Sequence, residues 1–239
     1  MFTRAPEEEA RAKRLPAVEG TRLFTGFLKG WTQRAFSAGA ELLVVTPQES
    51  ATELSRLLPN ARIEIQSQGT FAERVESAFA AAFECGAGTV LMVGGDTAPL
   101  DLAEIETAFQ HLESQAEALV LTPASDGGVN AIGFSAGARR SLANIAWQSS
   151  DVCRQLCYEG RRYGLALLLT TPGHDLDCAA DIRSLYRLSR SQSCWKAFRW
   201  LLLAVLFACR AAASQLAHAI GRVAGVAFAP RAPPLHLSY

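Results

Sequence analysis

The last quarter of the chain lacks acidic residues: no Asp or Glu follows Asp181, although eight Arg and Lys residues do. The whole chain holds 23 basic and 23 acidic residues, so residues 1–181 contain 15 of the basic and all 23 of the acidic ones. Their net charge is −8, and the remainder carries +8. A basic segment is attracted to phosphate-rich surfaces such as membranes and nucleic acids. The asymmetry therefore concerns partners and not the fold.

Other signatures are missing as well. The six cysteines include no C-x-x-C pair, which argues against a zinc knuckle, and the four histidines show no metal-ligand spacing. No G-x-S-x-G elbow and no Walker loop is present. Residues 7–9 are all Glu where a secretory signal needs an apolar run. We therefore expect a cytoplasmic chain with reduced thiols.

Short apolar runs alternate with amphipathic stretches over residues 1–190, which is typical of a parallel sheet covered by helices. With 49% hydrophobic residues the chain can bury one such core. The predicted strands are 41–46, 62–66, 89–93, 118–122, 131–134 and 165–170. The predicted helices are 20–37, 70–84, 102–114 and 151–160.

The start of the chain is unusual for a nucleotide-binding sheet, which normally opens with a strand that leads into a phosphate-binding loop. Only residues 1–4 precede the loop that we predict over residues 6–14. Either the first strand is very short or the start is truncated.

The strongest local signal is the sequence VLMVGGDTAPL at residues 90–100, where a buried strand ends in Gly94, Gly95 and Asp96. Open α/β sheets bind ligands at the carboxyl ends of their strands. The glycines allow a ligand to approach the backbone, and a carboxylate suits Mg²⁺ or Mn²⁺. The alternative is an ordinary Asp that caps the following helix.

Two further segments carry acidic residues beside predicted strands. Asp126, Gly127 and Gly128 lie between two strands and, taken alone, predict a hairpin turn. Asp175 and Asp177 alternate after another strand, so both carboxylates would point the same way in extended backbone. Acidic groups from different strand ends can clamp one metal ion, provided that they meet in space.

The N-terminal segment contains basic residues that could bind phosphate. Arg11, Lys13 and Arg14 could pair with a diphosphate, Arg most specifically because its planar fork binds two oxygens. The alternative is a solvated charged segment, since three Glu residues precede them.

Six segments in chain order carry a resemblance to a known family. They are Ala5, Pro6, Arg11, Lys13, Arg14 and Leu15; 69–75; 94–100; 123–134; Ile145, Trp147 and Ser149; and 175–177 with Asp181 and Ile182. Together they resemble GT-A-like glycosyltransferases of the arsenosugar-biosynthesis type, distant relatives of the molybdenum-cofactor and phospholactate nucleotidylyltransferases. The resemblance covers residues 2–190. It implies a Rossmann-like three-layer α/β/α sandwich of GT-A type with a mostly parallel sheet.

The resemblance also implies a transferase domain over residues 1–190 and roles for its residues. Asp96 and Asp177 would hold Mg²⁺ or Mn²⁺, and Asp126 would act catalytically on the acceptor side. The implied nucleotide-binding residues are Pro6, Arg11, Lys13, Arg14, Gly94 and Gly95, and the implied substrate-binding residues are Gly127, Gly128 and Trp147. The ligand would be a nucleotide-sugar or an NTP.

The sequence departs from the family pattern where a substrate should bind. Thr70 replaces an aspartate, Val129 and Asn130 replace an aromatic pair, and the basic loop contains an acidic run. We expect a metal-dependent glycosyltransferase. A nucleotidylyltransferase acting on a phosphorylated acceptor, and a non-catalytic module tethered to a membrane or partner, are the alternatives.

The tail, residues 191–239, is predicted as a separate basic, apolar helical extension, with a helix over 195–228. Its purely apolar run, 200–209, is too short for a bilayer core of ~30 Å, which takes about 20 residues. Lys196, Arg199 and Arg210 share one side of the helical wheel, so a helix lying on anionic lipid at the inner face of the membrane is coherent. The alternative is that this helix packs on the catalytic domain or forms a homodimer. We expect no nucleic-acid partner.

Overall fold

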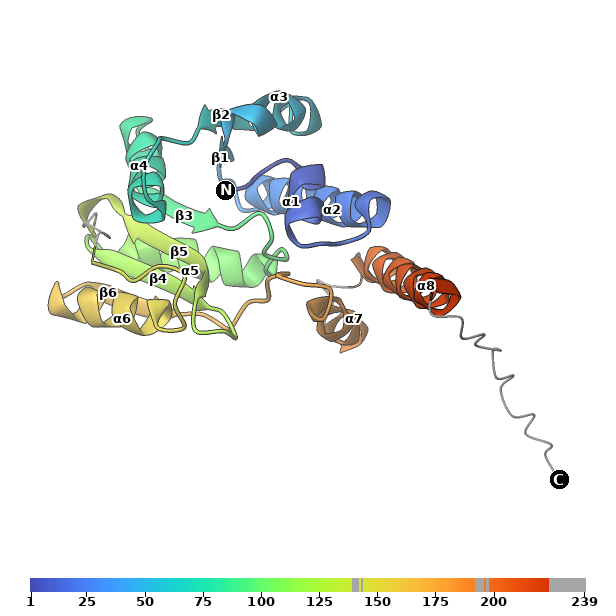
Figure 1. Cartoon of the computed structure of the whole chain (residues 1–239). Coiled ribbons are helices and arrows are strands. Elements are labelled where there is room, and N and C mark those ends of the chain that lie inside the picture. Colours follow the sequence, from blue (N-terminus) through green and yellow to red (C-terminus); the bar gives the residue numbers. More distant parts are fainter. Residues whose placement is uncertain (139–141, 143, 192–195, 197, 224–239) are drawn as a thin grey trace.

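The structure is a computed structural model and describes residues 1–138, 142, 144–191, 196 and 198–223. Its centre is a twisted sheet with helices on both faces (Figure 1). The strands are β1 (Leu43–Thr46), β2 (Arg62–Ile65), β3 (Thr89–Val93), β4 (Ala118–Pro123), β5 (Val129–Ser135) and β6 (Ala166–Leu169). All six predicted strands are confirmed, with boundaries within two residues at each end.

Two strand groups make up the sheet. β1 pairs in parallel with β2, and the second group has the order β3-β5-β4-β6. β4 and β6 are parallel, whereas β5 runs antiparallel to both β3 and β4. The mostly parallel α/β sheet that the sequence predicts is therefore present, with β5 as the reversed strand.

The two groups are joined by a very short first strand at the beginning of the chain. The Phe2 N–H donates to the Val93 carbonyl at 2.9 Å, and the Thr3 N–H donates to the Val45 carbonyl at 3.1 Å. Phe2 forms parallel bridges to Val45 and to Gly94. The first strand is therefore present and very short, with its bridges at Val45 near the end of β1 and at Gly94 just after β3.

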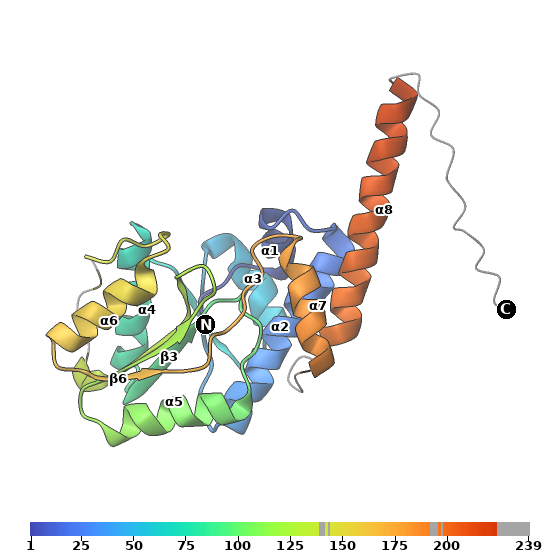
Figure 2. The ribbon, with the colours of Figure 1, turned by 90° about the horizontal axis from the view of Figure 1, so that it is seen from below.

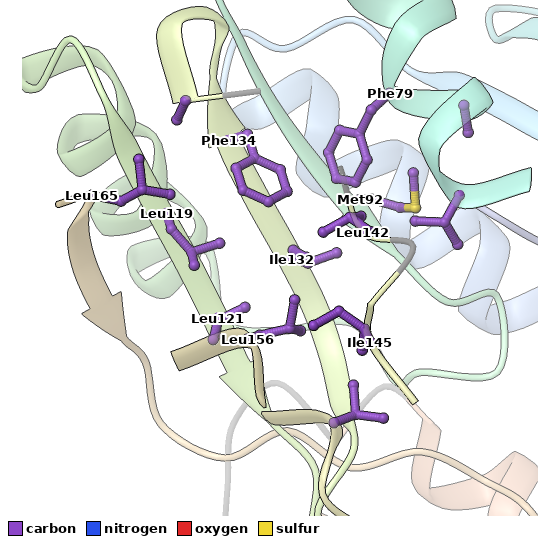
Figure 3. Packing of buried hydrophobic residues seen from close by; sticks show 14 of the residues in the cluster. Phe79, Met92, Leu119, Leu121, Ile132, Phe134, Leu142, Ile145, Leu156 and Leu165 are labelled. Atoms are coloured by element: carbon purple, nitrogen blue, oxygen red, sulfur yellow. The ribbon is translucent and has the colours of Figure 1, made fainter. Parts of the chain in front are cut away.

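Helices form a layer on each face of the sheet (Figures 1 and 2). α4 (Phe71–Glu84) and α6 (Val152–Arg162) cover one face, while α2 (Ala17–Ser37), α3 (Gln48–Leu57) and α5 (Leu102–Ser114) cover the other. A short 3-10 turn, η1, spans Ala136–Ala138. Figure 3 shows the core under α4, where the Phe79 and Phe134 rings meet edge to face at 5.2 Å. The predicted three-layer sandwich is confirmed.

The predicted loop over residues 6–14 is wrong for all but its last two residues, because α1 (Pro6–Ala12) is a helix. Pro6 occupies the first turn, where its missing N–H costs nothing. Three Glu residues follow in that turn and interact favourably with the helix dipole. Ala10 is fully buried, so tertiary packing stabilises this short helix.

A second hydrophobic cluster joins the two ends of the chain. It contains α1, α2, α7 (Asp181–Ser191) and α8 (Arg199–Val223). A Cβ atom on Gly26 would lie 2.9 Å from Leu201 Cδ1, and one on Gly30 would lie 2.9 Å from Phe198 Cζ. The glycines of α2 therefore allow the close approach of the C-terminal helix.

The predicted tail helix is thus present as α8, and one of its faces packs on the body. Residues 195, 197 and 224–228 of that prediction lie outside the described residues. Among the helices that the structure describes, none combines the length and the apolar character that crossing a bilayer requires.

A cavity of about 420 Å³ lies at the amino ends of β1 and β3. Its walls include Ala35 of α2, Ala82 of α4, Leu43 of β1, Leu91 of β3 and Phe109 of α5. Because the first strand is so short, no described strand lies between β1 and β3 in this half of the sheet, although each pairs with its other neighbour. The cavity is a consequence of that gap.

Candidate active site at the carboxyl ends of the strands

Asp96 and the segment 174–176 meet beyond the end of β3. The Ala98 N–H donates to the His174 carbonyl at 3.0 Å, and the Leu176 N–H donates to the Asp96 carbonyl at 3.1 Å. Thr97 and Asp175 form an antiparallel bridge between these bonds. The backbone itself therefore brings together acidic residues that are about 80 positions apart in the sequence.

Lys13 lies between two of these acidic side chains. Its Nζ donates to Asp96 Oδ2 at 2.8 Å and to Asp177 Oδ1 at 2.5 Å. Burial alone lowers the pKa of Lys13, but the two carboxylates outweigh burial and raise that pKa above its ordinary value. The predicted metal ligands Asp96 and Asp177 thus converge, and an ammonium group lies between them.

Asp126 joins the same rim from the turn between β4 and β5. One carboxylate oxygen from each of Asp126, Asp175 and Asp177 lies within 4.8 Å of the others, so the three could hold one metal ion. Asp126 Oδ1 also accepts from the Gly128 N–H at 2.9 Å. Asp126, predicted as a catalytic group, therefore lies with the candidate metal ligands, while Asp96 is outside this group of three.

Negative charge exceeds positive charge at this rim. Burial, followed by the neighbouring Asp177 carboxylate, raises the pKa of Asp175 to about 6. Burial and then Asp96 also raise the pKa of Glu9, which is 7% exposed and has Arg4 3.9 Å away. Lys13 bonds to only two of these carboxylates. A bound cation would compensate the rest.

The glycines at the rim allow other groups to approach their backbone closely. A Cβ on Gly95 would lie 1.9 Å from Thr3 Oγ1, so Gly95 admits the first strand, and its role in nucleotide binding stays a prediction. Gly127 has φ 91°, and a Cβ there would lie 1.9 Å from the Ser150 carbonyl oxygen. A Cβ on Gly94 would lie 2.7 Å from Asp96 Oδ1. These close approaches fix the loops that carry Asp96 and Asp126.

The predicted phosphate-binding residues follow α1. Pro6 is buried at the start of that helix, while Arg11 and Arg14 are exposed near its end. Arg14 has φ 55°, an uncommon backbone conformation for a residue with a side chain. It directs the chain away from the helix immediately after Lys13.

Several buried polar atoms have no hydrogen-bond partner in the part of the chain that the structure describes, and some of them lie at this end of the sheet. Thr46 Oγ1, Ser67 Oγ, Arg74 Nε and Trp147 Nε1 are buried without a hydrogen-bond partner among the described residues. Thr46 ends β1 and Ser67 follows β2, so both lie at carboxyl ends of strands. Unpaired buried polar groups are costly, which makes them candidate contacts for a ligand. Trp147, a predicted substrate residue, also stacks edge to face on Phe71 at 5.2 Å.

Thr70 has a local structural role. Its Oγ1 accepts from the Glu73 N–H at 3.3 Å, while Glu73 Oε2 accepts from the Thr70 N–H at 2.7 Å. This capping box starts α4. Thr70 therefore serves as the N-cap of α4.

Comparison with known proteins agrees with this architecture. Residues 32–149 match the model of a family described as an uncharacterised protein conserved in bacteria, DUF2064. Comparison with curated proteins gives no significant match.

Solved structures extend the similarity to most of the chain. A presumed nucleotide-diphospho-sugar transferase from Desulfovibrio desulfuricans G20 has a TM-score of 0.72 at 22% identity, covering 85% of this chain and 96% of the other. A nucleotidyl transferase from a Methanothermobacter species has a TM-score of 0.54 at 14% identity, covering 80% of this chain and 97% of the other. A CMP:2-keto-3-deoxy-manno-octonic acid synthetase in complex with CTP has a TM-score of 0.51 at 10% identity, covering 79% of this chain and 96% of the other.

At these identities the similarity establishes the fold. The chain thus carries a DUF2064 match over residues 32–149 and has the GT-A-like fold of nucleotide-diphospho-sugar transferases.

Proposed function

We propose that the chain is a metal-dependent transferase that takes a nucleotide-activated sugar as its donor. The observation that carries the proposal is the rim itself. There the Lys13 ammonium lies between Asp96 and Asp177, next to a group of three carboxylates. The transferase names of the structures that share this fold also support it. The narrower relationship to arsenosugar-biosynthesis enzymes remains a prediction.

The donor set fits a hard divalent cation. Carboxylate oxygens are the ligands that Mg²⁺ and Mn²⁺ prefer, and Asp126, Asp175 and Asp177 offer three within 4.8 Å of one another. Asp96 would complete or replace one ligand if Lys13 moved away. A bound cation would offset charge on the diphosphate of the donor.

Lys13 would serve the donor phosphates directly. Its ammonium is half-buried and held charged by two carboxylates, so it forms a fixed positive group beside the candidate metal ligands. As charge develops on a leaving diphosphate, such a group stabilises it. Arg11 and Arg14 are exposed on either side of Lys13 in the sequence and could reach more distant phosphate oxygens.

A nucleotidylyltransferase acting on a phosphorylated acceptor is the second candidate. Two of the structures that share the fold are a nucleotidyl transferase and a synthetase in complex with CTP. In that case the rim would hold a free NTP. A non-catalytic module is the third, since Thr70, Val129 and Asn130 stand where the family has other residues.

Calorimetry of the full chain separates the three. UDP-sugars, GDP-sugars and free NTPs are titrated with and without Mn²⁺, using wild type, Asp96→Asn and Glu113→Gln, a matched carboxylate change beside the cavity at the opposite end of the sheet. The proposal expects Mn²⁺-dependent binding of a nucleotide-sugar that Asp96→Asn weakens and Glu113→Gln leaves intact. Binding of free NTP alone would select the nucleotidylyltransferase. No binding of any nucleotide would reject both enzymes.

A further inference from the structure

Helix α8 has apolar side chains on two opposite faces. Leu202 and Val205, together with Phe198 just before the helix, are buried against α2 and α7. On the other side, Trp200 is 75% exposed and Phe207 is 60% exposed. They are seven residues apart, which is two turns of a helix with about 3.6 residues per turn, so they lie on one stripe.

The exposed stripe is long and isolated from the rest of the body. Half-exposed Leu203 lies between Trp200 and Phe207 on the same side of the helix. Figure 2 shows α8 extending beyond α2 and α7. Two large exposed rings in line are an apolar patch of the kind that marks an interaction surface.

Basic side chains border this stripe. Arg199 and Arg210 are both exposed and fall along one edge of it. On the neighbouring helix α7, Arg183, Arg187 and Arg190 are exposed at spacings of four and three, which places them on one face. Because no acidic residue follows Asp181, nothing within this segment neutralises them. An apolar stripe edged by exposed arginines suits an anionic partner.

We propose that the outer face of α8, defined by Trp200, Leu203, Phe207, Arg199 and Arg210, docks on an anionic lipid surface. Trp and Phe side chains insert at the boundary of headgroups and acyl chains, and arginines bind the lipid phosphates. Since no described helix meets the criteria for a membrane span, α8 lies along the surface.

A second copy of the chain fits this face less well. A two-fold symmetric dimer brings the same patch of both copies together. Pairing two such stripes would place Arg199 and Arg210 of one copy near those of the other, and α8 offers no carboxylate to offset the repulsion. A lipid surface satisfies both the rings and the arginines.

The lipid-facing helices connect directly to the rim of the sheet. Asp181, the first residue of α7, accepts hydrogen bonds from the backbone N–H groups of Asp177 at 3.0 Å and Cys178 at 2.7 Å. Docking would therefore hold the candidate site close to a membrane. The inference does not depend on the proposed function, because it rests on α7 and α8 alone.

Vesicle flotation of the full chain tests the docking surface. Vesicles of phosphatidylcholine alone are compared with vesicles containing phosphatidylglycerol at low and high salt. Wild type is expected to float with the anionic vesicles and to be released by salt. The double substitutions Trp200→Ser with Phe207→Ser, and Arg199→Glu with Arg210→Glu, are each expected to lower the bound fraction about tenfold or more. All four positions are exposed, so folding should be retained.

Matched control variants make the same kinds of substitution on other helices. Tyr158→Ser removes an exposed ring from α6, and Arg56→Glu with Arg161→Glu makes the same charge change on α3 and α6. Both are expected to float as wild type does. The inference is overturned if wild type does not float, or if the α8 variants and controls float equally. It is also overturned if the α8 face supports a dimer instead. In that case light scattering would give the Trp200→Ser, Phe207→Ser variant half the mass of wild type, and wild type would not bind vesicles.

Discussion

The two ends of the central sheet differ in the chemistry of the side chains that line them. At the amino ends of β1 and β3 lies a cavity of about 420 Å³ with mostly apolar walls. At the carboxyl ends, Lys13 bridges Asp96 and Asp177, and Asp126 and Asp175 lie alongside. The amino-end cavity is a packing gap beneath a short strand. The charged rim has the groups that a diphosphate and a cation require.

The comparison shows why the presence of a cavity alone is a poor guide to a site here. The amino-end cavity includes no group of carboxylates like that of the rim among the described residues. In open α/β sheets the strands deliver loops at their carboxyl ends, and ligands bind there. Five experiments can break or sharpen the contrast between the two ends.

The largest effect is expected at the carboxyl end. Asp177→Asn removes a carboxylate that contacts Lys13 and belongs to the candidate metal group. We expect Mn²⁺-dependent nucleotide affinity to fall about 100-fold, because both the cation and Lys13 lose a partner. Glu113→Gln at the amino-end cavity should leave the affinity unchanged in the same calorimetric assay. Equal losses in the two variants would remove the distinction between the ends.

The second experiment concerns the contact between Gly95 at the rim and Thr3 of the first strand. Gly95→Ala places a Cβ 1.9 Å from Thr3 Oγ1 and 2.3 Å from Thr3 Cβ. We expect a loss of about 2–3 kcal/mol in the free energy of unfolding, measured with urea. Gly88→Ala, at the amino end of β3, meets open space and should change stability by about 0.5 kcal/mol or less. Comparable losses would contradict the described packing of residues 1–3.

The third experiment uses pH. Cation binding needs the ionised form of Asp175, whose pKa is raised to about 6. We therefore expect Mn²⁺ affinity to fall about tenfold between pH 7 and pH 5, as the ionised fraction falls. Electron paramagnetic resonance of free Mn²⁺ measures this. An affinity that does not change over this range would exclude Asp175 as a ligand.

The same raised pKa has a consequence for stability without metal. A carboxyl group whose folded pKa exceeds its unfolded pKa stabilises the fold at low pH, and the stabilisation is lost as pH rises toward the folded pKa. Asp175→Asn should therefore be more stable than wild type at pH 7.5, and the difference should vanish below about pH 4. Thermal unfolding at both pH values provides the comparison.

The smallest effect is expected from filling the amino-end cavity. Ala82→Leu adds apolar atoms to a wall of the cavity. Unfolding free energy should rise by about 0.5–2 kcal/mol, as for other cavity-filling substitutions, without a change in nucleotide affinity. Ala103→Leu on the exposed side of α5 controls for helix propensity. A loss of nucleotide binding in Ala82→Leu would move the site to this cavity.

Sequence periodicity predicted the sheet and most of the helices because their apolar residues repeat with clear spacing. The convergence of Asp96 and Asp177 also followed from their positions after strands and from the family resemblance. Whether they bind metal remains a prediction. The helix α1 was missed because seven residues starting with Pro6 and three Glu look like a polar loop. Its stability comes from burial of Ala10, which periodicity over so short a segment does not reveal.

Other features depend on contacts that no local pattern encodes. Lys13 reaches Asp177 across 164 positions of sequence. The placement of Thr46 and Ser67 without partners depends on how β1 and β2 end beside α4. The role of Gly95 depends on Thr3, far away in the chain. Sequence patterns therefore located the rim, while tertiary contacts determined which residues meet there.

The central claim is that the carboxyl-end rim holds a divalent cation and the phosphates of a nucleotide. A crystal structure of the full chain with Mn²⁺ and a nucleotide-sugar, using the anomalous signal of manganese, tests it most directly. The account predicts one manganese peak bound by Asp175 and Asp177, with Lys13 Nζ on a phosphate oxygen. Manganese and nucleotide located elsewhere, with Lys13 still bridging Asp96 and Asp177, would contradict it.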